Sequence, residues 1–364
     1  MSTATDIAAL KARCTALEKK DIALSTAATA LAARVAKLEA VKPVDYAAQI
    51  AAIQKEVDAL KYIISPTPPP PDETVFNVMD YGAHRNNSTD DHPHIQAAVD
   101  ACYAAGGGIV YMPAGTYYVY DGDDSYYGGT ARMKLSITLK TGVTLRGDGV
   151  GQTIIRSAGW SGVSAIGAME ATDFGVEHLS ITFPVANEAT TNVDGIKLMQ
   201  CSGGTLDSLY IENCYLGINY IGCSDIASSS VDCYFCQTPF MVDMQQEFMT
   251  SDNLSFTDCT AHSAANGGIP YGFAVYSDDG EDSVRISNVT LTNCSSHENA
   301  QGGLYSKWTD RLTVTGCSFV DNTGYGFYVV NTKDYWSAGN TATGNSASNS
   351  LPYNGGNSTA RASL

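Results

Sequence analysis

Asp243, Tyr276 and Lys307 occupy the fifth position of three short, similar segments of the chain. A carboxylate can serve as a base, a phenol as an acid, and an ammonium group can stabilise negative charge that develops during a reaction. If the segments are neighbouring strands about 4.8 Å apart, the three side chains form a stripe roughly 10 Å long on one sheet face. This stripe is the candidate catalytic site, and Asp194 of an earlier repeat is a further candidate carboxylate.

Other residues of the same face are candidates for holding a sugar chain. Tyr305, Tyr328 and Trp308 could stack on sugar rings, which present apolar C–H faces to aromatic side chains. Lys197 and Asn219 lie earlier in the same column and could bind polar groups of the sugar. Three interpretations stay open: catalysis, saccharide binding without catalysis, and a structural role as an ion pair beside aromatic contacts.

Repeated strands must position these residues. Alternating apolar and polar segments recur at irregular spacings of roughly 19 to 35 residues, as in solenoids whose coils differ in loop length. Four of these segments end in cysteine and a fifth is a degenerate copy, so we expect one interior column of reduced, buried thiols rather than disulfides or a zinc site: Cys214, Cys233, Cys259, Cys294 and Cys317. His262 and His297 each follow such a cysteine by three residues, which predicts that they stack at a turn.

A second strand follows each cysteine, and its alternation defines two outward columns. The first column is Lys197, Asn219, Met241, Ala274, Tyr305 and Tyr328, and the second is Met199, Ile221, Asp243, Tyr276, Lys307 and Val330.

The start of the repetitive region combines a short strand, a helix and a second strand. Tyr81-Gly82-Ala83 is followed by Ser88-Thr89-Asp90-Asp91, a helical pattern over 95–101, three glycines at 106–108 and a strand that ends at Pro113. This order resembles the start of the pectate-lyase-like, right-handed parallel β-helix proteins, in which the helix covers strand edges that would otherwise be open. The resemblance implies an all-β, single-stranded solenoid over 75–340, followed by a polar tail over 341–364.

Residues 75–330 also resemble, more loosely, the catalytic module of mannuronan C5-epimerases. The Lys-Val-Asp-Gly motif of those enzymes falls on 192–195, which keeps Asp194 but lacks the lysine. Their Tyr-Gly-Phe-Asp-Pro-His motif falls on 216–221, which lacks the tyrosine, aspartate and histidine. This argues against epimerisation by that mechanism. The asparagine-initiated motif of polygalacturonases fits 192–195 as well, but the later motifs of those enzymes do not follow.

The first 64 residues predict a coiled coil. Leucines recur every seven residues at Leu10, Leu17, Leu24, Leu31 and Leu38, with a second seam residue three positions before each. A proline-rich linker over 65–74 follows, and its proline run favours a stiff polyproline II spacer. We therefore expect a helical stalk that assembles the chain into a homotrimer, although its seam residues also allow a dimer.

Charge and composition exclude several classes of protein. The net charge is −17; residues 1–65 hold 9 basic and 7 acidic residues, so the remainder holds 12 and 31, a net of −19. An acidic body argues against nucleic-acid binding, and the absence of long apolar runs and of a basic leader argues against membrane insertion and a secretory signal. No cofactor is required, although the acidic loop of Asp278, Asp279, Glu281 and Asp282 could bind calcium.

A stalk, a rigid linker and a β-helix together resemble bacteriophage tailspike and tail-fibre proteins. The resemblance implies attachment to a virion tail or baseplate protein and binding of host-surface polysaccharide, either without catalysis or with depolymerisation by a lyase or hydrolase reaction. It also implies synthesis in the host cytoplasm and an extracellular location after release. Two alternatives stay open: a bacterial lyase or C5-epimerase that acts on a uronic-acid polymer, and a non-catalytic structural tail component.

Overall fold

A computed structural model describes residues 74–127, 130–158, 162–184, 193–244, 250–262, 264, 269–277, 286–347 and 360–362. The predicted stalk, nearly all of the linker and the acidic loop 278–282 lie outside these residues. Residues 71–364 form one compact unit, separate from residues 1–70.

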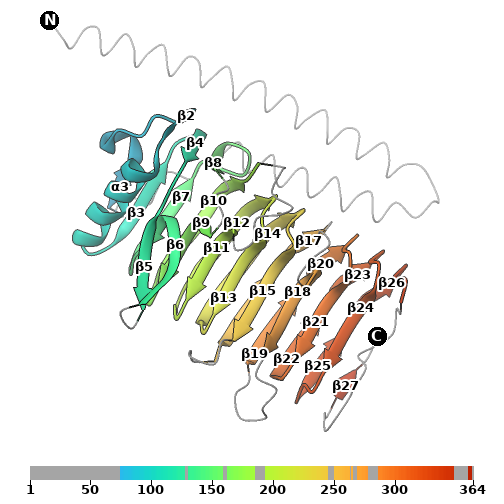
Figure 1. Ribbon diagram of the computed structural model, residues 1–364. Helices are drawn as coiled ribbons and strands as arrows, with labels where there is room; N and C mark the ends of the chain where they lie inside the picture. Colours follow the sequence, from blue (N-terminus) through green and yellow to red (C-terminus); the bar gives the residue numbers. More distant parts are fainter. Residues whose placement is uncertain are drawn as a thin grey trace, which may run out of the picture. The chain divides into compact units, whose positions relative to one another are not determined.

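Short parallel strands dominate this unit (Figure 1). The first part comprises β1 (Val75–Asn77), the 3₁₀ helix η1 (Val78–Tyr81), β2 (Asn86–Asp90), α3 (His92–Ala104), β3 (Gly108–Met112), β4 (Gly115–Val119), β5 (Asp123–Tyr127), β6 (Thr130–Leu139), β7 (Val143–Gly147), β8 (Thr153–Ser157), β9 (Val163–Met169) and β10 (Gly175–Thr182). The middle part comprises β11 (Asp194–Met199), β12 (Thr205–Glu212), β13 (Leu216–Ile221), β14 (Ser224–Tyr234), β15 (Thr238–Met244), β16 (Asp252–Thr257), β17 (Thr260–His262) and β18 (Tyr271–Ser277). The last part comprises β19 (Ile286–Thr292), β20 (Ser295–His297), β21 (Gly302–Lys307), β22 (Thr309–Thr315), β23 (Ser318–Val320), β24 (Tyr325–Val330), β25 (Tyr335–Ala338), β26 (Thr341–Thr343) and β27 (Ala360–Ala362).

The strands form two sheets that enclose one core. Sheet B has nine strands in the order β24-β21-β18-β15-β13-β11-β9-β6-β5, and sheet A holds the other eighteen. All pairings are parallel except the hairpin of β5 with β6. The predicted all-β fold, a parallel β-helix, is confirmed, and its strands continue past residue 340 into β26 and β27.

Single residues in the left-handed backbone region turn the chain sharply at the corner of each coil. At the bend within sheet A these residues have φ between 52° and 65°: His178, Ser208, Ser230, Asp258, Asn293, Gly316 and Gly339. Asn, Asp and Gly are enriched in this region because they tolerate it at the least steric cost. The Asn, Asp or Gly before Cys214, Cys259, Cys294 and Cys317 therefore marks a corner, after which the cysteine is buried in the core.

The nine cysteines among the described residues are all buried and free. Cys259, Cys294 and Cys317 share one column, because Ser295 N donates to Cys259 O and Ser318 N donates to Cys294 O. The prediction is wrong for the other two. Cys214 lies against Cys236, with 3.1 Å between the sulfurs, and Cys233 pairs in register with Ala261. The reason is that β14 runs through the bend without a break, so its end falls later in the coil than the ends of β16 and β19.

A ladder of buried asparagines holds the last coils together. Asn299 Nδ2 donates to Asn322 Oδ1 and Asn322 Nδ2 donates to Asn345 Oδ1, both over 2.9 Å. The same oxygens accept the backbone N–H groups of Asn299 and Asn322. The side chains thus satisfy backbone groups that the corner leaves without a strand partner.

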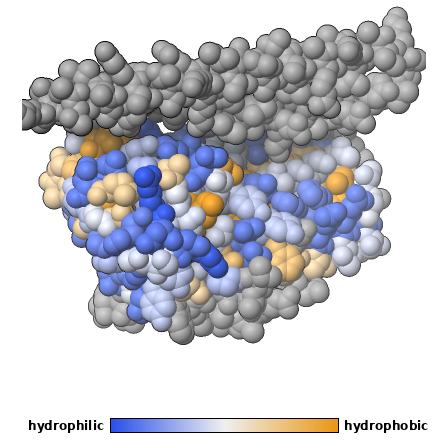
Figure 2. Space-filling model, turned by 90° about the horizontal axis from the view of Figure 1, so that it is seen from above, coloured by the Kyte–Doolittle hydropathy of each residue, from blue (hydrophilic) through white to orange (hydrophobic). Residues whose placement is uncertain are grey.

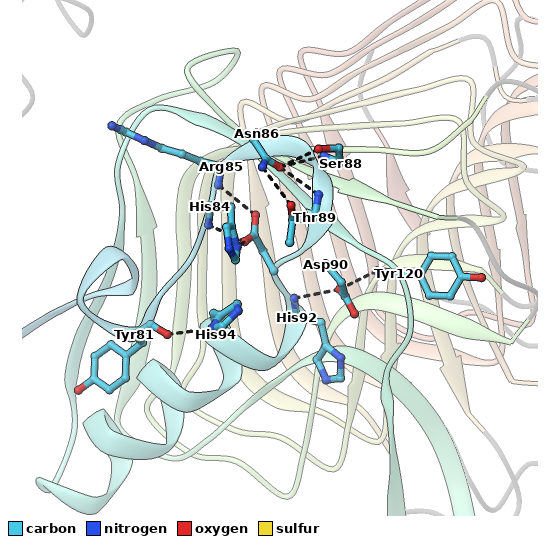
Figure 3. Close-up of polar contacts among 11 residues, drawn as sticks. Tyr81, His84, Arg85, Asn86, Ser88, Thr89, Asp90, His92, His94 and Tyr120 are labelled. Carbon is cyan, nitrogen blue, oxygen red and sulfur yellow. Dashed lines mark hydrogen bonds and ion pairs between the residues drawn. The ribbon is translucent and has the colours of Figure 1, made fainter.

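The helix α3 covers the N-terminal end of the coil, as the resemblance implied, and a polar network fixes it there (Figure 3). Asp91 is fully buried and accepts hydrogen bonds from the backbone N–H groups of His84 and Arg85 at 2.6 and 3.1 Å. The ring of His94 contacts the carbonyl of Tyr81 through Nδ1 at 2.8 Å. Gly82 lies beneath this ring with φ +93°, and a Cβ there would lie 3.1 Å from Nδ1.

The described surface is largely hydrophilic on the face shown in Figure 2, with apolar residues in small, separate patches. Among the described residues, no helix is both long and apolar enough to cross a membrane.

Candidate functional site

The register of sheet B brings the predicted stripe together. Asp243 of β15 pairs with Tyr276 of β18, which pairs with Lys307 of β21. All three side chains are partly exposed on the outer face. Because two strand spacings separate Asp243 from Lys307, their backbones lie roughly 10 Å apart. The predicted placement is confirmed, while the catalytic role of the stripe stays a prediction.

Asp194, Lys197 and Asn219 form a compact group on the same face, here called the acceptor pocket. The carboxylate Oδ2 of Asp194 lies 3.5 Å from Lys197 Nζ and accepts a 3.5 Å hydrogen bond from Asn219 Nδ2. Gly195 permits this arrangement because a side chain at this position would point into the core, where its Cβ would lie 2.6 Å from Ile211. The inward step breaks the alternation of β11, so that Asp194 and Lys197 share the outer face.

The acceptor pocket is far less exposed than the sequence indicated. Asp194 is 1% and Asn219 5% exposed, and Asp194 Oδ1 and Asn219 Oδ1 have no hydrogen-bond partner. Burial raises the pKa of Asp194, and the nearby Lys197 and Asn219 offset this only in part. Of the three side chains Lys197 is the most exposed, at 18%.

The methionine cluster covers the next part of the outer face and corrects the predicted columns. It comprises Met133, Leu135, Met169, Met199 and Ile221 and is separate from the main core. Met199 and Ile221 were expected to face outward, but they are only 3% and 0% exposed. The cause is strand β6 of the β5–β6 hairpin, whose Met133 and Leu135 belong to the same buried cluster as Met199 of β11 and Ile221 of β13. No periodic pattern in the sequence predicts this long-range contact.

A second apolar strip accounts for the other buried members of the outward columns. Met241 and Ala274 are buried beside Leu216, and Tyr276 packs against them. Part of the predicted outer face is therefore apolar and buried from solvent, and the polar groups of this face lie between apolar strips.

Four stacked tyrosines occupy the last strands of sheet B, here called the tyrosine row: Tyr271, Tyr305, Tyr328 and Tyr325. Successive ring centroids lie 5.2, 5.6 and 5.1 Å apart, with interplanar angles of 26°, 12° and 24°. Gly302 makes room for the first ring, since a Cβ there would lie 2.5 Å from Tyr271. Burial raises the pKa of Tyr271, and the neighbouring phenols raise it further.

This stacking changes how the row could meet a sugar. Tyr305 and Tyr328 were expected to offer ring faces, but each lies against a ring on both sides. The inner rings therefore present edges and hydroxyl groups outward, and Tyr325, 39% exposed at the end of the row, is the ring with the most accessible surface. Tyr271 and Tyr325 were not among the predicted site residues, although both directly precede a strand glycine.

Trp308 lies at the corner after β21 with φ +58°. The equivalent corners of other coils hold Glu170, Gln200, Gly222 and Asn331, which are smaller or less rigid. A left-handed backbone costs an ordinary L-residue roughly 1–2 kcal/mol. Trp308 is the bulkiest of the residues at this corner, and it directly follows Lys307.

The remaining predictions concern metal ions and histidines. Within the described parts of the chain, no cluster of His, Cys, Asp and Glu is arranged to hold a metal ion; Asp278, Asp279, Glu281 and Asp282 lie outside them. His262 and His297 stack as predicted, with centroids 5.0 Å apart. Burial lowers the pKa of His297, and the adjacent His262 lowers it further.

Comparison with known families decides the classification. The model of the family described as rhamnogalacturonase A/epimerase, pectate lyase-like, matches residues 75–328. The chain belongs to this family. Mannuronan C5-epimerase AlgE1 of Azotobacter vinelandii is 41% identical over 113 residues, which are 29% of this chain and 8% of that enzyme. The chain therefore spans only a small part of this curated relative.

Solved structures share the fold. The A-module of Azotobacter vinelandii mannuronan C-5 epimerase AlgE4 covers 75% of this chain, which in turn covers 79% of that module, with 22% identity and a TM-score of 0.51. The surface adhesin PfbA of Streptococcus pneumoniae covers 74% of this chain, which covers 73% of PfbA, with 14% identity and a TM-score of 0.55. A phage tailspike from Acinetobacter baumannii bacteriophage Fri1 is a more distant neighbour, at a TM-score of 0.44.

Proposed function

We propose that this protein is a tailspike- or tail-fibre-type protein that binds polysaccharide of a host cell surface along the outer face of sheet B. The observation that carries the proposal is the tyrosine row, which ends in the exposed Tyr325. Trp308 follows the opposite end of the neighbouring strand β21, next to Lys307. Aromatic edges and hydroxyl groups along a sheet, with one accessible ring at the end, suit a chain of sugars. Membership of a family named for polysaccharide-modifying enzymes supports the same class of ligand.

The proposal extends to assembly and location. Residues 1–64 would join three chains and attach them to a virion tail or baseplate protein, leaving the β-helix free to meet the cell surface. The protein would be made in the host cytoplasm and act outside it after release.

The test measures binding of the full chain to purified surface polysaccharides by titration calorimetry, with and without calcium. Tyr325→Ala and Trp308→Asn should each weaken binding at least tenfold. Trp336→Ala serves as the matched control, because Trp336 is exposed on a strand of sheet A. Parent protein that binds none of the polysaccharides, or variants that bind as tightly as the parent, would contradict the proposal.

Depolymerisation is a second candidate, favoured by the registered stripe of Asp243, Tyr276 and Lys307. Incubation with the bound polysaccharide should then release reducing ends, together with ultraviolet absorbance of an unsaturated product for a lyase and without it for a hydrolase. Asp243→Ala combined with Lys307→Ala should remove the activity and keep the fold. Binding without the release of new reducing ends would indicate that the protein is an adhesin without depolymerase activity.

A further inference from the structure

Two buried oxygen atoms in the acceptor pocket lack a hydrogen-bond partner. They are Asp194 Oδ1 and Asn219 Oδ1, and both side chains are at least nine-tenths buried. Native proteins leave few buried polar atoms unpaired, because desolvation without a new hydrogen bond is unfavourable. The pair therefore indicates a ligand group that completes the pocket.

The chemistry of the two atoms restricts that group. Both are acceptors, so the ligand must bring hydrogen-bond donors. Lys197 is the one cation of the pocket, and it already faces the carboxylate of Asp194 at 3.5 Å. A uronic-acid carboxylate would bring further acceptors to two unpaired acceptors, and a metal ion would meet the ammonium group of Lys197.

A neutral sugar meets all of these requirements. Its hydroxyl groups can donate to Asp194 Oδ1 and Asn219 Oδ1 while another hydroxyl oxygen accepts from Lys197 Nζ. Hydrogen bonds to ionised groups are the stronger kind. Along β11 and β13 the polar residues lie between the buried Leu216 on one side and the buried Met199 and Ile221 on the other.

We propose that Asp194, Lys197 and Asn219 form a subsite for a neutral sugar residue, at which the protein discriminates against uronic acids. This inference rests on the proposed polysaccharide binding and specifies its ligand class. Entry of the sugar requires Lys197, the most exposed member of the pocket, to turn outward.

The experiment compares neutral oligosaccharides of glucose, mannose and galactose with oligomannuronate and oligogalacturonate of equal length, each titrated into the full chain. Neutral probes should bind at least tenfold more tightly than uronates. Asn219→Leu should reduce the affinity for neutral probes at least tenfold, and Asp194→Asn, a near-isosteric change, should reduce it as well. Ser255→Ala, on a strand of sheet A, is the matched control, and circular dichroism verifies the fold of each variant.

Three results would overturn the inference. The first is equal or tighter binding of uronates, and the second is parent-like affinity of both pocket variants for neutral probes; either leaves the proposed polysaccharide binding intact. The third is calcium alone binding to the parent and not to Asp194→Asn, which would make the pocket a cation site. Failure of every probe to bind would instead remove the proposed function, and this inference with it.

Discussion

At the scale of single residues, Asp194 is where burial and charge oppose each other most directly. Its carboxylate is almost fully enclosed, and its two side-chain partners, Lys197 and Asn219, each lie 3.5 Å away. Such contacts recover only part of the hydration that an ionised carboxylate loses on burial. The folded protein thus maintains an unfavourable group at this position, as binding sites commonly do.

This opposition predicts a pH-dependent stability. Burial raises the pKa of Asp194, so the folded state keeps the proton to higher pH than the unfolded state. The stabilising contribution of protonated Asp194 is therefore lost as the pH rises from the unfolded pKa of about 3.9 through the folded pKa. Asp194→Asn should be more stable than the parent at pH 7, by roughly 1–2 kcal/mol, and nearly equal to it at pH 3. Urea denaturation at both pH values measures this; an equal difference at both would contradict it.

At the scale of elements, the corners determine how the coils stack. A single left-handed residue bends each coil of sheet A, and the residue that follows it is buried: leucine or valine in the earlier coils, cysteine or asparagine in the later ones. In the last coils Asn322 connects Asn299 and Asn345 and also accepts a backbone N–H group. Removing one rung therefore leaves several neighbouring groups without partners.

Asn322→Ala should destabilise the β-helix by about 3 kcal/mol, since each buried group left unpaired costs roughly 1–3 kcal/mol. Thr343→Ala, exposed on the next coil, should change stability by less than about 0.5 kcal/mol. The midpoints of thermal and urea unfolding provide the comparison. Equal unfolding midpoints for the two variants would contradict a stabilising role of the asparagine ladder.

At the scale of the whole molecule, charge divides the chain into two parts. Residues 1–65 carry a small positive balance and the remainder a net charge of −19. An acidic body repels a polyanionic polymer in general, so neutral glycans are favoured over uronates on these grounds as well. The net charge of the body does not depend on the acceptor pocket, and it favours the same class of ligand, a neutral glycan.

Assembly through the heptad seam is testable at the same scale. Leu17→Asp together with Leu24→Asp places charges in the predicted seam and should convert an oligomer to a monomer. The β-helix should keep its circular dichroism spectrum and melting temperature. Light scattering measures the mass, and an unchanged oligomer would refute a stalk that holds the chains together.

The sequence by itself determined the solenoid, because alternation and repeated corner residues are local signals that each coil carries. It also determined the register of Asp243, Tyr276 and Lys307, since counting from equivalent strand positions fixes neighbours in a parallel sheet. The tertiary structure decided which of these positions are exposed to solvent. Long-range packing of the β5–β6 hairpin buries Met199 and Ile221, and rings from neighbouring coils cover the faces of Tyr305 and Tyr328. The inward step at Gly195 brings Asp194 beside Lys197 and Asn219. No local pattern encodes these contacts, because each depends on how one coil lies against another.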